Sequence, residues 1–289
     1  MAKKLKKIAI CSLKKDKHIK ELALQVIETL SCLSVEAFVN ETLADISSDL
    51  KDNVLRKVDY ESLDLIIVIG GDGSILGYCR EYGSLGIPVL GINLGKLGFL
   101  ADIAPNNISK SLLEVVEGKY KVEKRAFLEA TLNDIPIPQR AVNEIVIHSG
   151  SVARLMEYEL KIDNSFVYRQ KADGLIINTP TGSTAYSLSG GGPILHPSIK
   201  AITLLPMFPH SLSSSPMVIK DNSSLTVKII SSSKASISID SQEEKKIKRG
   251  DVIDIKKSKI FYTLIHPRDH NFYSACRTKL GWSTGITEE

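Results

Sequence analysis

The sequence predicts a two-domain protein, in which an N-terminal α/β domain built on a parallel sheet precedes a mainly antiparallel, β-rich domain. A chain of 289 residues is long enough to bury two cores. Up to about residue 103, short aliphatic runs alternate with helical patterns, which is typical of βαβ units. Beyond that point, most apolar segments are strands separated by polar turns. We therefore expect domains at residues 1–103 and 104–270, with the tail 271–289 packing back on the first as a helix.

Each element of the first domain follows from its hydrophobic period. Apolar residues recur on one face of a helix over residues 19–30, at the 3.6-residue spacing. Strands are expected over residues 8–13, 35–39, 65–69 and 87–92. Further helices are expected over residues 46–57, with a weak pattern, and over residues 74–81, before Gly83.

The second domain begins with one amphipathic helix and continues almost entirely in strands. The helix fits residues 108–116, with Gly118 just beyond its end. Strands are expected over residues 121–132, 140–148, 155–162, 165–168, 174–178, 201–206, 225–230, 236–239 and 251–256.

Composition and charge exclude several classes of protein. The formal net charge is only +4, and the lysine-rich start lacks the aromatic and arginine residues of a nucleic-acid site. No apolar run approaches the roughly 18 residues that a membrane helix needs. The four cysteines are scattered without a C-x-x-C pair, which is typical of reduced thiols in the cytoplasm. We expect a cytoplasmic protein without nucleic-acid or membrane partners.

The first candidate site is a glycine-rich turn after the most apolar strand. The run at residues 65–69 fits a strand buried on both faces, and Gly70-Gly71-Asp72-Gly73 follows it. Open α/β sheets bind ligands at the carboxyl ends of their strands. Glycines permit tight or left-handed turns and leave the backbone open to phosphate. The alternative is an ordinary strand-to-helix turn in which Asp72 is the N-cap. Neither the P-loop pattern nor the G-x-G-x-x-G fingerprint is present.

The second domain carries two further polar motifs. A concentration of hydroxyls and glycines follows the predicted strand at residues 174–178. In it, Ser183 and Thr184 could cap a helix or bind a polar ligand, and Tyr186 could stack on a base. The alternative is a surface loop, because turns favour the same residues. The pair Asn143-Glu144 suits ribose hydroxyls or an adenine edge, and its alternative is a solvated strand end.

His266 and His270 are four residues apart, a spacing that places two metal ligands on one face of a helix. Pro267 lies between them and disfavours a regular helix. The sequence indicates no third ligand, so we interpret both histidines as structural and predict no metal site in the protein itself.

Taken together, these motifs resemble those of NAD kinases over nearly the whole chain past residue 60. The shared motifs are Gly70 to Gly73, the glycine-spaced stretch 91–100, Asn143-Glu144 and the block 179–186 with its following glycines. Residues 239–242 and 279–282 resemble the ATP-using bacterial branch. The motif GGDG alone also occurs in phosphofructokinases and lipid kinases, whereas the combination is specific.

The resemblance implies transfer of the γ-phosphoryl group of ATP to the 2′-hydroxyl of the adenosine ribose of NAD, giving NADP. Asp72 is then the proton acceptor, and Gly71 and Gly73 let phosphates approach. We expect a divalent cation, Mg²⁺ carried by the nucleotide, to offset the triphosphate charge. The resemblance assigns dinucleotide or phosphate binding to Asn143, Glu144, Arg154, Lys171, Asp173, Thr184, Ala185, Tyr186, Ser187, Leu188, Ser189 and Gln242.

Asp173 matches a family position that reaches a dinucleotide in a neighbouring subunit, which implies a homo-oligomer, dimer or tetramer, with composite sites. Two other functions remain open at this point. A lipid or sugar kinase could share the GGDG turn, and a regulator that binds NADP(H) could share the dinucleotide residues without catalysis. The phosphoryl donor also remains open among ATP, other nucleotides and polyphosphate.

Overall fold

The computed structural model describes residues 5–50, 53–55, 57–95, 98–150, 155–211, 214–231 and 234–282. The chain divides into two compact units, the first formed by Met1–Lys124 with Tyr262–Glu289 and the second by Arg125–Phe261. These boundaries differ from the expected ones at 103/104 and 270/271. Helix α4 (Ile108–Val116) accounts for the first difference, because its apolar face is buried in the core of the first unit.

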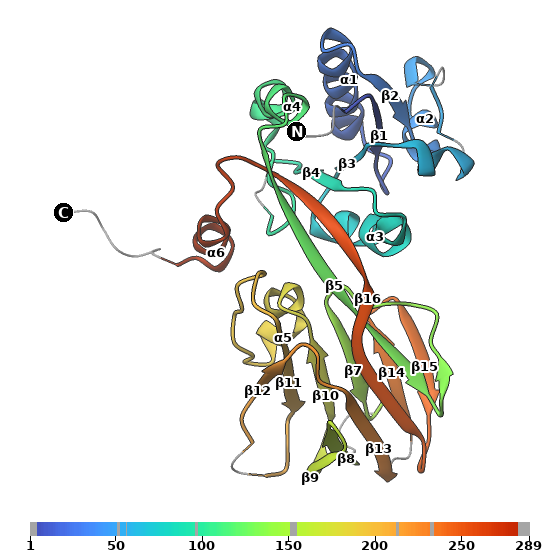
Figure 1. The fold of residues 1–289 in the computed structure, drawn as a ribbon, viewed down its shortest axis with the longest axis vertical. Coiled ribbons are helices and arrows are strands. Elements are labelled where there is room, and N and C mark those ends of the chain that lie inside the picture. Colours follow the sequence, from blue (N-terminus) through green and yellow to red (C-terminus); the bar gives the residue numbers. More distant parts are fainter. Residues whose placement is uncertain are drawn as a thin grey trace, which may run out of the picture. The chain divides into compact units, whose positions relative to one another are not determined.

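A parallel sheet organises the first unit (Figure 1), as the sequence predicts. Its strand order is β2-β1-β3-β4-β16, and each neighbouring pair is parallel. The strands are β1 (Lys7–Cys11), β2 (Glu36–Val39), β3 (Leu65–Ile69), β4 (Val89–Ile92) and the end of β16 (Val252–Pro267). The other helices are α1 (Lys17–Cys32), α2 (Glu41–Ala44), α3 (Asp72–Tyr82), α6 (Phe272–Leu280), and the 3-10 helices η1 (Ser48–Leu50), η2 (Lys57–Ser62), η3 (Gly83–Leu85) and η4 (Pro105–Asn107).

Both faces of this sheet are covered, which explains why β3 is apolar throughout. Leu65, Ile67 and Ile69 pack in one cluster with the buried faces of α1 and α4. On the other face, helix α3 contacts β3 and β4. Burial on both faces leaves no position of β3 for a polar side chain, so its polar residues come only where the strand ends.

The second unit contains two antiparallel layers, which confirms the predicted β-rich second domain. One layer is a six-stranded sheet of the order β12-β11-β10-β7-β14-β15, and the other layer includes the antiparallel strands β13, β8 and β9. The six strands are β12 (Met217–Lys220), β11 (Ala201–Met207), β10 (Gly174–Asn178), β7 (Glu144–His148), β14 (Ala235–Ile239) and β15 (Glu243–Ile247). The other layer contains β5 (Tyr120–Leu132), β6 (Ile135–Pro136), β8 (Met156–Ile162), β9 (Ser165–Ala172), β13 (Leu225–Ser231) and the start of β16.

The core of this unit lies between the layers. Alternate residues of the six-stranded sheet, such as Ile145 and Ile177, pack in one cluster with Leu160 and Val227 of the other layer. The opposite face of the six-stranded sheet carries a smaller apolar cluster of Val146, Ile176 and Leu205. Two short helices, η5 (Thr181–Thr184) and α5 (Tyr186–Ser189), follow β10 and complete this unit.

The main errors of the predicted elements are at sheet edges. Strands β12 and β15 were not predicted, because most of their side chains are exposed and carry no apolar alternation. The helix expected over residues 46–57 is replaced by the 3-10 helices η1 and η2, with several residues between them outside the described part of the chain.

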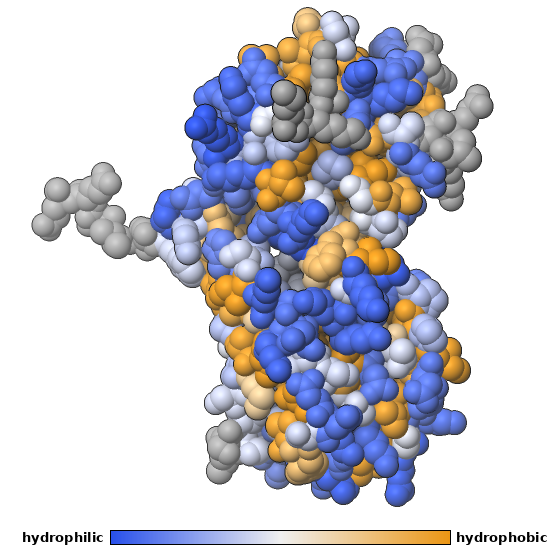
Figure 2. Space-filling model, in the orientation of Figure 1, coloured by the Kyte–Doolittle hydropathy of each residue, from blue (hydrophilic) through white to orange (hydrophobic). Residues whose placement is uncertain are grey.

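The surface and the thiols carry little further information. Figure 2 shows polar and apolar residues interspersed over the visible face of each unit. Within the described residues, no helix is long and apolar enough to cross a membrane. Among the described residues the four cysteines form no disulfide, and of these four Cys32 alone is exposed. Burial raises the pKa of the Cys11 thiol to about 12, so this thiol is not a reactive nucleophile.

Candidate functional site

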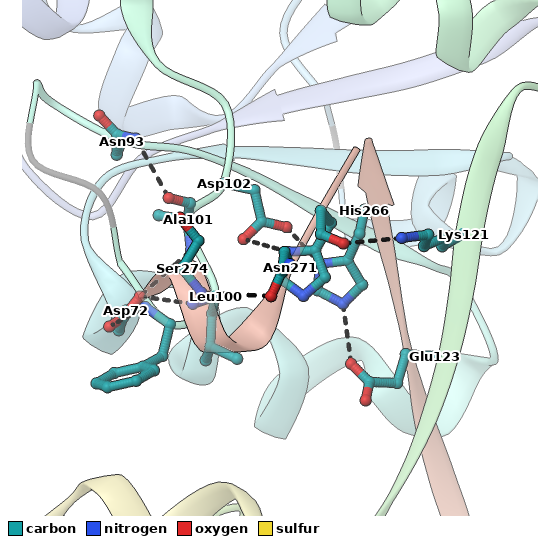
Figure 3. Close-up of polar contacts among 12 residues, drawn as sticks. Asp72, Asn93, Leu100, Ala101, Asp102, Lys121, Glu123, His266, Asn271 and Ser274 are labelled. Carbon is teal, nitrogen blue, oxygen red and sulfur yellow. Dashed lines mark hydrogen bonds and ion pairs between the residues drawn. The ribbon is translucent and has the colours of Figure 1, made fainter. Parts of the chain in front are cut away.

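Asp72 lies at the carboxyl end of β3, where α3 begins. The N-cap of α3 is Gly71, with no side-chain cap hydrogen bond, so Asp72 is not the N-cap that the alternative interpretation required. Its carboxylate instead accepts three backbone hydrogen bonds from the loop after β4 (Figure 3). Oδ2 accepts from the Phe99 N–H at 3.0 Å, and Oδ1 accepts from the N–H groups of Leu100 at 3.0 Å and Ala101 at 3.2 Å. The carboxylate is therefore held in one orientation, at a half-buried position.

The backbone conformation does not require glycine at the positions before and after Asp72. Neither Gly71 nor Gly73 has a positive φ, so neither glycine serves a left-handed turn. A Cβ atom added at either position would meet nothing within 4 Å. The fold therefore has no steric need for glycine at these positions. Their bare backbone leaves space that a ligand atom can enter beside Asp72.

The loop that holds Asp72 depends on two residues, Gly98 and Asn93, for which we predicted no separate role. A Cβ atom added to Gly98 would lie 2.1 Å from Asp72 Oδ1, so glycine is required for the carboxylate to reach the loop. Asn93 is buried and fastens both sides of the loop. Its Nδ2 donates to the Ala101 carbonyl at 3.2 Å, and its Oδ1 accepts from the Gly95 N–H at 2.8 Å.

Immediately after this loop, Asp102 joins the two histidines of the sequence analysis (Figure 3). Asp102 Oδ2 contacts Nδ1 of His266, and Asp102 Oδ1 lies 3.2 Å from Nδ1 of His270. Nε2 of His266 lies 3.0 Å from Glu123 Oε2. The expectation that the histidines have no third neighbour of ligand type was therefore wrong. Burial raises the pKa of Asp102, but hydrogen bonds and charge from both histidines outweigh it and hold that pKa below its usual value.

In the second unit, another carboxylate holds the backbone of Asn143-Glu144 in place through hydrogen bonds. Asp240 is buried in the β14–β15 hairpin, where Asp240 and Ser241 have φ values of 47° and 55°. Its Oδ1 accepts from the N–H groups of Asn143 at 2.8 Å and Glu144 at 3.1 Å, and its Oδ2 accepts from Val142 at 2.9 Å. Glu144 is only 3% exposed. The alternative of a solvated strand end therefore does not hold for Glu144.

The hydroxyl-rich segment that follows β10, residues 179–189, packs directly against Asn143. Thr179 Oγ1 donates to the Val142 carbonyl at 2.6 Å, and the Thr179 N–H donates to the Asn143 carbonyl at 2.9 Å. A Cβ atom on Gly182 would lie 2.2 Å from the same Asn143 carbonyl oxygen. Ser183 Oγ donates to the Pro180 carbonyl at 2.7 Å. Some of the hydroxyls therefore maintain the turn itself, and they bring it to the amide and carboxylate that the sequence singled out.

The remaining predicted residues of this segment differ in exposure. Tyr186 is 44% exposed at the start of α5, so one aromatic ring is accessible to a ligand. Ser187 is fully buried, and its Oγ has no hydrogen-bond partner among the described residues. Thr184, Ala185 and Leu188 are half-buried, and Ser189 is exposed.

Three other predicted residues in the described part of the chain lie outside the hydroxyl-rich segment. Asp173 lies just before β10 and Lys171 lies near the end of β9. Asn143 and Glu144 adjoin the opposite end of β10, about 17 Å from Asp173 at 3.3 Å per residue. Gln242 is exposed in the same hairpin turn as Asp240. Arg154 lies outside the described residues.

Comparisons with known proteins agree on one family. The model of the ATP-NAD kinase N-terminal domain matches residues 7–120, and that of the ATP-NAD kinase C-terminal domain matches residues 142–266. An NAD kinase of Teredinibacter turnerae is 46% identical over 266 residues, covering 90% of this chain and 91% of the relative. An NAD kinase of Azotobacter vinelandii is 49% identical over 238 residues, covering 80% of each chain.

Two solved structures share the fold. The crystal structure of yeast NADH kinase complexed with NADH has a TM-score of 0.85 and 27% identity, covering 99% of this chain and 90% of that one. An NAD kinase from Archaeoglobus fulgidus in complex with ATP has a TM-score of 0.75 and 26% identity, covering 94% of this chain and 99% of that one.

Proposed function

The chain belongs to the NAD kinase family, and we propose that it transfers the γ-phosphoryl group of ATP to the 2′-hydroxyl of the adenosine ribose of NAD. The observation that carries the proposed mechanism is the fixed carboxylate of Asp72. Phosphoryl transfer requires positioning, charge neutralisation and a proton acceptor for the attacking hydroxyl. A carboxylate that three N–H groups orient at the end of a buried strand meets the last requirement.

In this mechanism Asp72 takes the proton of the ribose 2′-hydroxyl as the oxygen attacks the γ-phosphorus. The bond from that phosphorus to the bridging oxygen of ADP breaks, and ADP leaves. Asp72 Oδ2 accepts a single N–H bond, so it retains lone-pair capacity for the hydroxyl proton. The open backbone at Gly71 and Gly73 supports close approach of phosphate oxygens.

The nucleotide requires a divalent cation, which we propose to be Mg²⁺. Magnesium in nucleotide sites is usually held by the phosphates with one or two carboxylates. The glycine turn offers one carboxylate, Asp72, and this donor set fits a cation carried mainly by ATP. When bound, the cation neutralises the charge of the triphosphate.

The second unit binds the dinucleotide in this proposal. The amide of Asn143 and the carboxylate of Glu144 suit ribose hydroxyls or the adenine edge, and the exposed ring of Tyr186 suits stacking on the base. The hydroxyls and backbone of the hydroxyl-rich segment complete the set. The other residues proposed to bind the dinucleotide are Thr184, Ala185, Ser187, Leu188, Ser189 and Gln242.

We also propose a cytoplasmic homo-oligomer. Because Asp173 lies at the far end of β10 from Asn143, and Lys171 lies two residues earlier in β9, they suit a dinucleotide bound by a neighbouring subunit. One edge of the six-stranded sheet, β15, is highly charged, whereas the other, β12, exposes Met217 and Val218. Charged edges resist strand pairing, so β12 is the edge that suits self-association. Light scattering on the purified protein would test this, and a monomeric mass would contradict it.

The cysteines also support the proposed location. Proteins of the cytoplasm usually keep their thiols reduced, and the four cysteines here form no disulfide among the described residues.

The test of the proposed function is a coupled assay with purified protein, ATP, Mg²⁺ and NAD, in which an NADP-specific dehydrogenase reports the product. We expect NADP formation that requires both ATP and the cation. Parallel reactions with polyphosphate in place of ATP define the donor. Phosphorylation of a lipid or sugar without NADP, or binding of NADP without turnover, would contradict the proposal in favour of the two alternatives.

Gly98→Ala is expected to lower kcat by about 10²-fold, because displacing a reacting group by an ångström has a cost of this order. The new methyl group would overlap Asp72 Oδ1 and force either the carboxylate or the loop to move. Steady-state kinetics measure the effect. The matched control is Gly77→Ala in α3, whose Cβ would meet only the exposed Leu13 side chain, at 3.2 Å. Equal kinetics in the two variants would show that Gly98 does not position Asp72.

A further inference from the structure

A cluster of two imidazoles and one carboxylate in the first unit has the composition of a transition-metal site. The ligand atoms of Asp102, His266 and His270 all lie within 4.8 Å of one another. A zinc ion binds such nitrogen and oxygen atoms at about 2.0–2.2 Å, so small side-chain rotations bring all three into its coordination sphere. We propose that these three residues bind one divalent transition-metal ion, of which Zn²⁺ is the representative.

Hydrogen-bond accounting at His266 supports this assignment. The Glu123 carboxylate 3.0 Å from Nε2 is an acceptor, which places a proton on Nε2 and leaves Nδ1 directed at Asp102. Without a metal, contact between Nδ1 and an ionised carboxylate requires a second proton, and the ring is then cationic. With a metal, Nδ1 binds the ion and the ring stays neutral. A ligand histidine that donates its other N–H to a carboxylate is the usual outer arrangement of zinc sites.

The stacking of the two rings leads to the same conclusion. The centroids of His266 and His270 are 4.1 Å apart, with an interplanar angle of 22°. Both rings direct Nδ1 at Asp102, so two imidazole nitrogens converge on one carboxylate, as the ligands of a single ion do. A divalent ion bound to both Nδ1 atoms would satisfy these contacts with one cation. The cation then lies beside the carboxylates of Asp102 and Glu123.

The backbone holds the three ligands in place before any metal binds. Lys121 Nζ donates to the His270 carbonyl at 2.8 Å, and the His270 N–H donates to the Pro267 carbonyl at 3.0 Å, closing the turn after β16 (Figure 3). Ile103, next to Asp102, bonds through its N–H to Gly91. Preorganised ligands lose little conformational entropy on binding, which favours affinity.

The site is accessible and is chemically distinct from the nucleotide's magnesium. The side chains of Asp102 and His266 are 6% and 2% exposed, whereas that of His270 is 16% exposed and offers an entry path. Imidazole ligands suit zinc, iron, nickel and copper, whereas magnesium prefers oxygen ligands. Three protein ligands leave a further coordination position for water.

Metal binding would also fasten the loop that holds Asp72. Residues 99–101 donate their N–H groups to Asp72, and Asp102 follows directly. An ion at Asp102 therefore links this loop to the end of β16 and to the residue before the N-cap of α6. The ion would act as a structural clamp on the first unit.

The test uses the full chain, freed of metal by a chelator and titrated with Co²⁺ and Zn²⁺ in the presence of excess Mg²⁺. We expect one equivalent to bind, with the intense visible absorption of four- or five-coordinate Co²⁺, and a rise in the thermal midpoint of unfolding. Glu123→Gln should lower affinity by about 10- to 100-fold, and His270→Ala, which removes a ligand, by more. His18→Ala, an exposed histidine in the same unit, is the matched control and should bind like the parent protein.

Circular dichroism of each metal-free variant confirms folding before titration, and half-buried His270 is preferred to buried His266 for that reason. Weak Co²⁺ absorption typical of an octahedral aqua ion would overturn the proposal, as would affinity unchanged in His270→Ala. Because the readout is binding and spectroscopy, its failure is distinguishable from a failure of kinase activity.

Discussion

Asp72→Asn is expected to lower kcat by about 10²- to 10⁴-fold, the range that a positioned general base contributes. Asparagine has nearly the shape of aspartate but cannot accept the 2′-hydroxyl proton. The KM for NAD should change much less, because the residues proposed to bind the dinucleotide are untouched. Steady-state kinetics give both constants, and calorimetry with NAD measures binding directly. Turnover close to that of the parent protein would show that Asp72 is not the base.

The hydrogen bonds of Asp72 require a second variant, because asparagine also changes how the loop is held. Its NH₂ group would face a backbone N–H at one of the positions where the carboxylate now accepts. Asp72→Ala with added formate separates the two roles. Formate can replace a missing proton acceptor in solution, so partial recovery of kcat supports the chemical role. No recovery, together with lost NAD binding, would assign Asp72 to loop positioning alone.

Asp64→Asn provides the matched control for this experiment. Asp64 Oδ2 accepts from the backbone N–H groups of Lys6 at 2.8 Å and Lys7 at 3.0 Å, at the start of β1 in the same unit. The substitution thus removes a carboxylate with the same kind of backbone contact but no proposed role in chemistry. We expect kcat to stay within about twofold of the parent value, since surface substitutions of this kind have small effects.

Asp240→Asn is expected to destabilise the second unit by about 2–4 kcal/mol and to raise the KM for NAD. The amide has one acceptor oxygen where the carboxylate has two, so at least one buried N–H among residues 142–144 loses its partner. An unpaired buried group costs about 1–3 kcal/mol, and the charge-assisted bonds that remain also weaken. Denaturant unfolding followed by circular dichroism measures the stability. The kinetic effect should be larger in KM than in kcat, because Asn143 and Glu144 move.

Asp163→Asn is the control for Asp240→Asn. Asp163 also lies in a hairpin turn with positive φ, and its carboxylate accepts from the Ser224 N–H at 2.9 Å and the Ser223 hydroxyl at 3.0 Å. It is exposed and lies apart from the proposed dinucleotide residues, so we expect a smaller loss of stability and an unchanged KM. Equal effects on KM in the two variants would exclude a specific role for Asp240 in holding Asn143-Glu144.

The two aspartates use the same device in different units. Each carboxylate accepts three consecutive backbone N–H groups, from residues 99–101 at Asp72 and from residues 142–144 at Asp240. Charge-assisted bonds of this kind are shorter and stronger than neutral ones. They fix residues 99–101 and 142–143, which lie outside the strands, and the first residue of β7. The two carboxylates differ in exposure. Buried Asp240 can only hold the backbone in place, whereas half-buried Asp72 also has an oxygen available to substrate.

Much of the fold could be predicted because its signals are local. The apolar run of β3, the face of α1 and the strand β10 each depend on side-chain spacing within one segment. The edge strands β12 and β15 were missed because exposed strands need no apolar alternation. The predicted domain boundary differs from that of the compact units, because the amphipathic pattern of α4 does not specify which core the helix joins.

The sequence by itself determined the family, the buried strand that presents Asp72, and the motifs around Asn143 and the hydroxyl-rich segment, because these are contiguous patterns. Only the tertiary structure decided which hydrogen bonds hold these motifs in place. Asp72 bonds to residues 27–29 positions away, Asp240 to residues 96–98 positions away, and Asp102 to His266 across 164 positions. Hydrogen bonds between such distant segments leave no periodic trace in the chain. They form only when the sheets bring strand ends together, which is also why the third neighbour of the two histidines was invisible in the sequence.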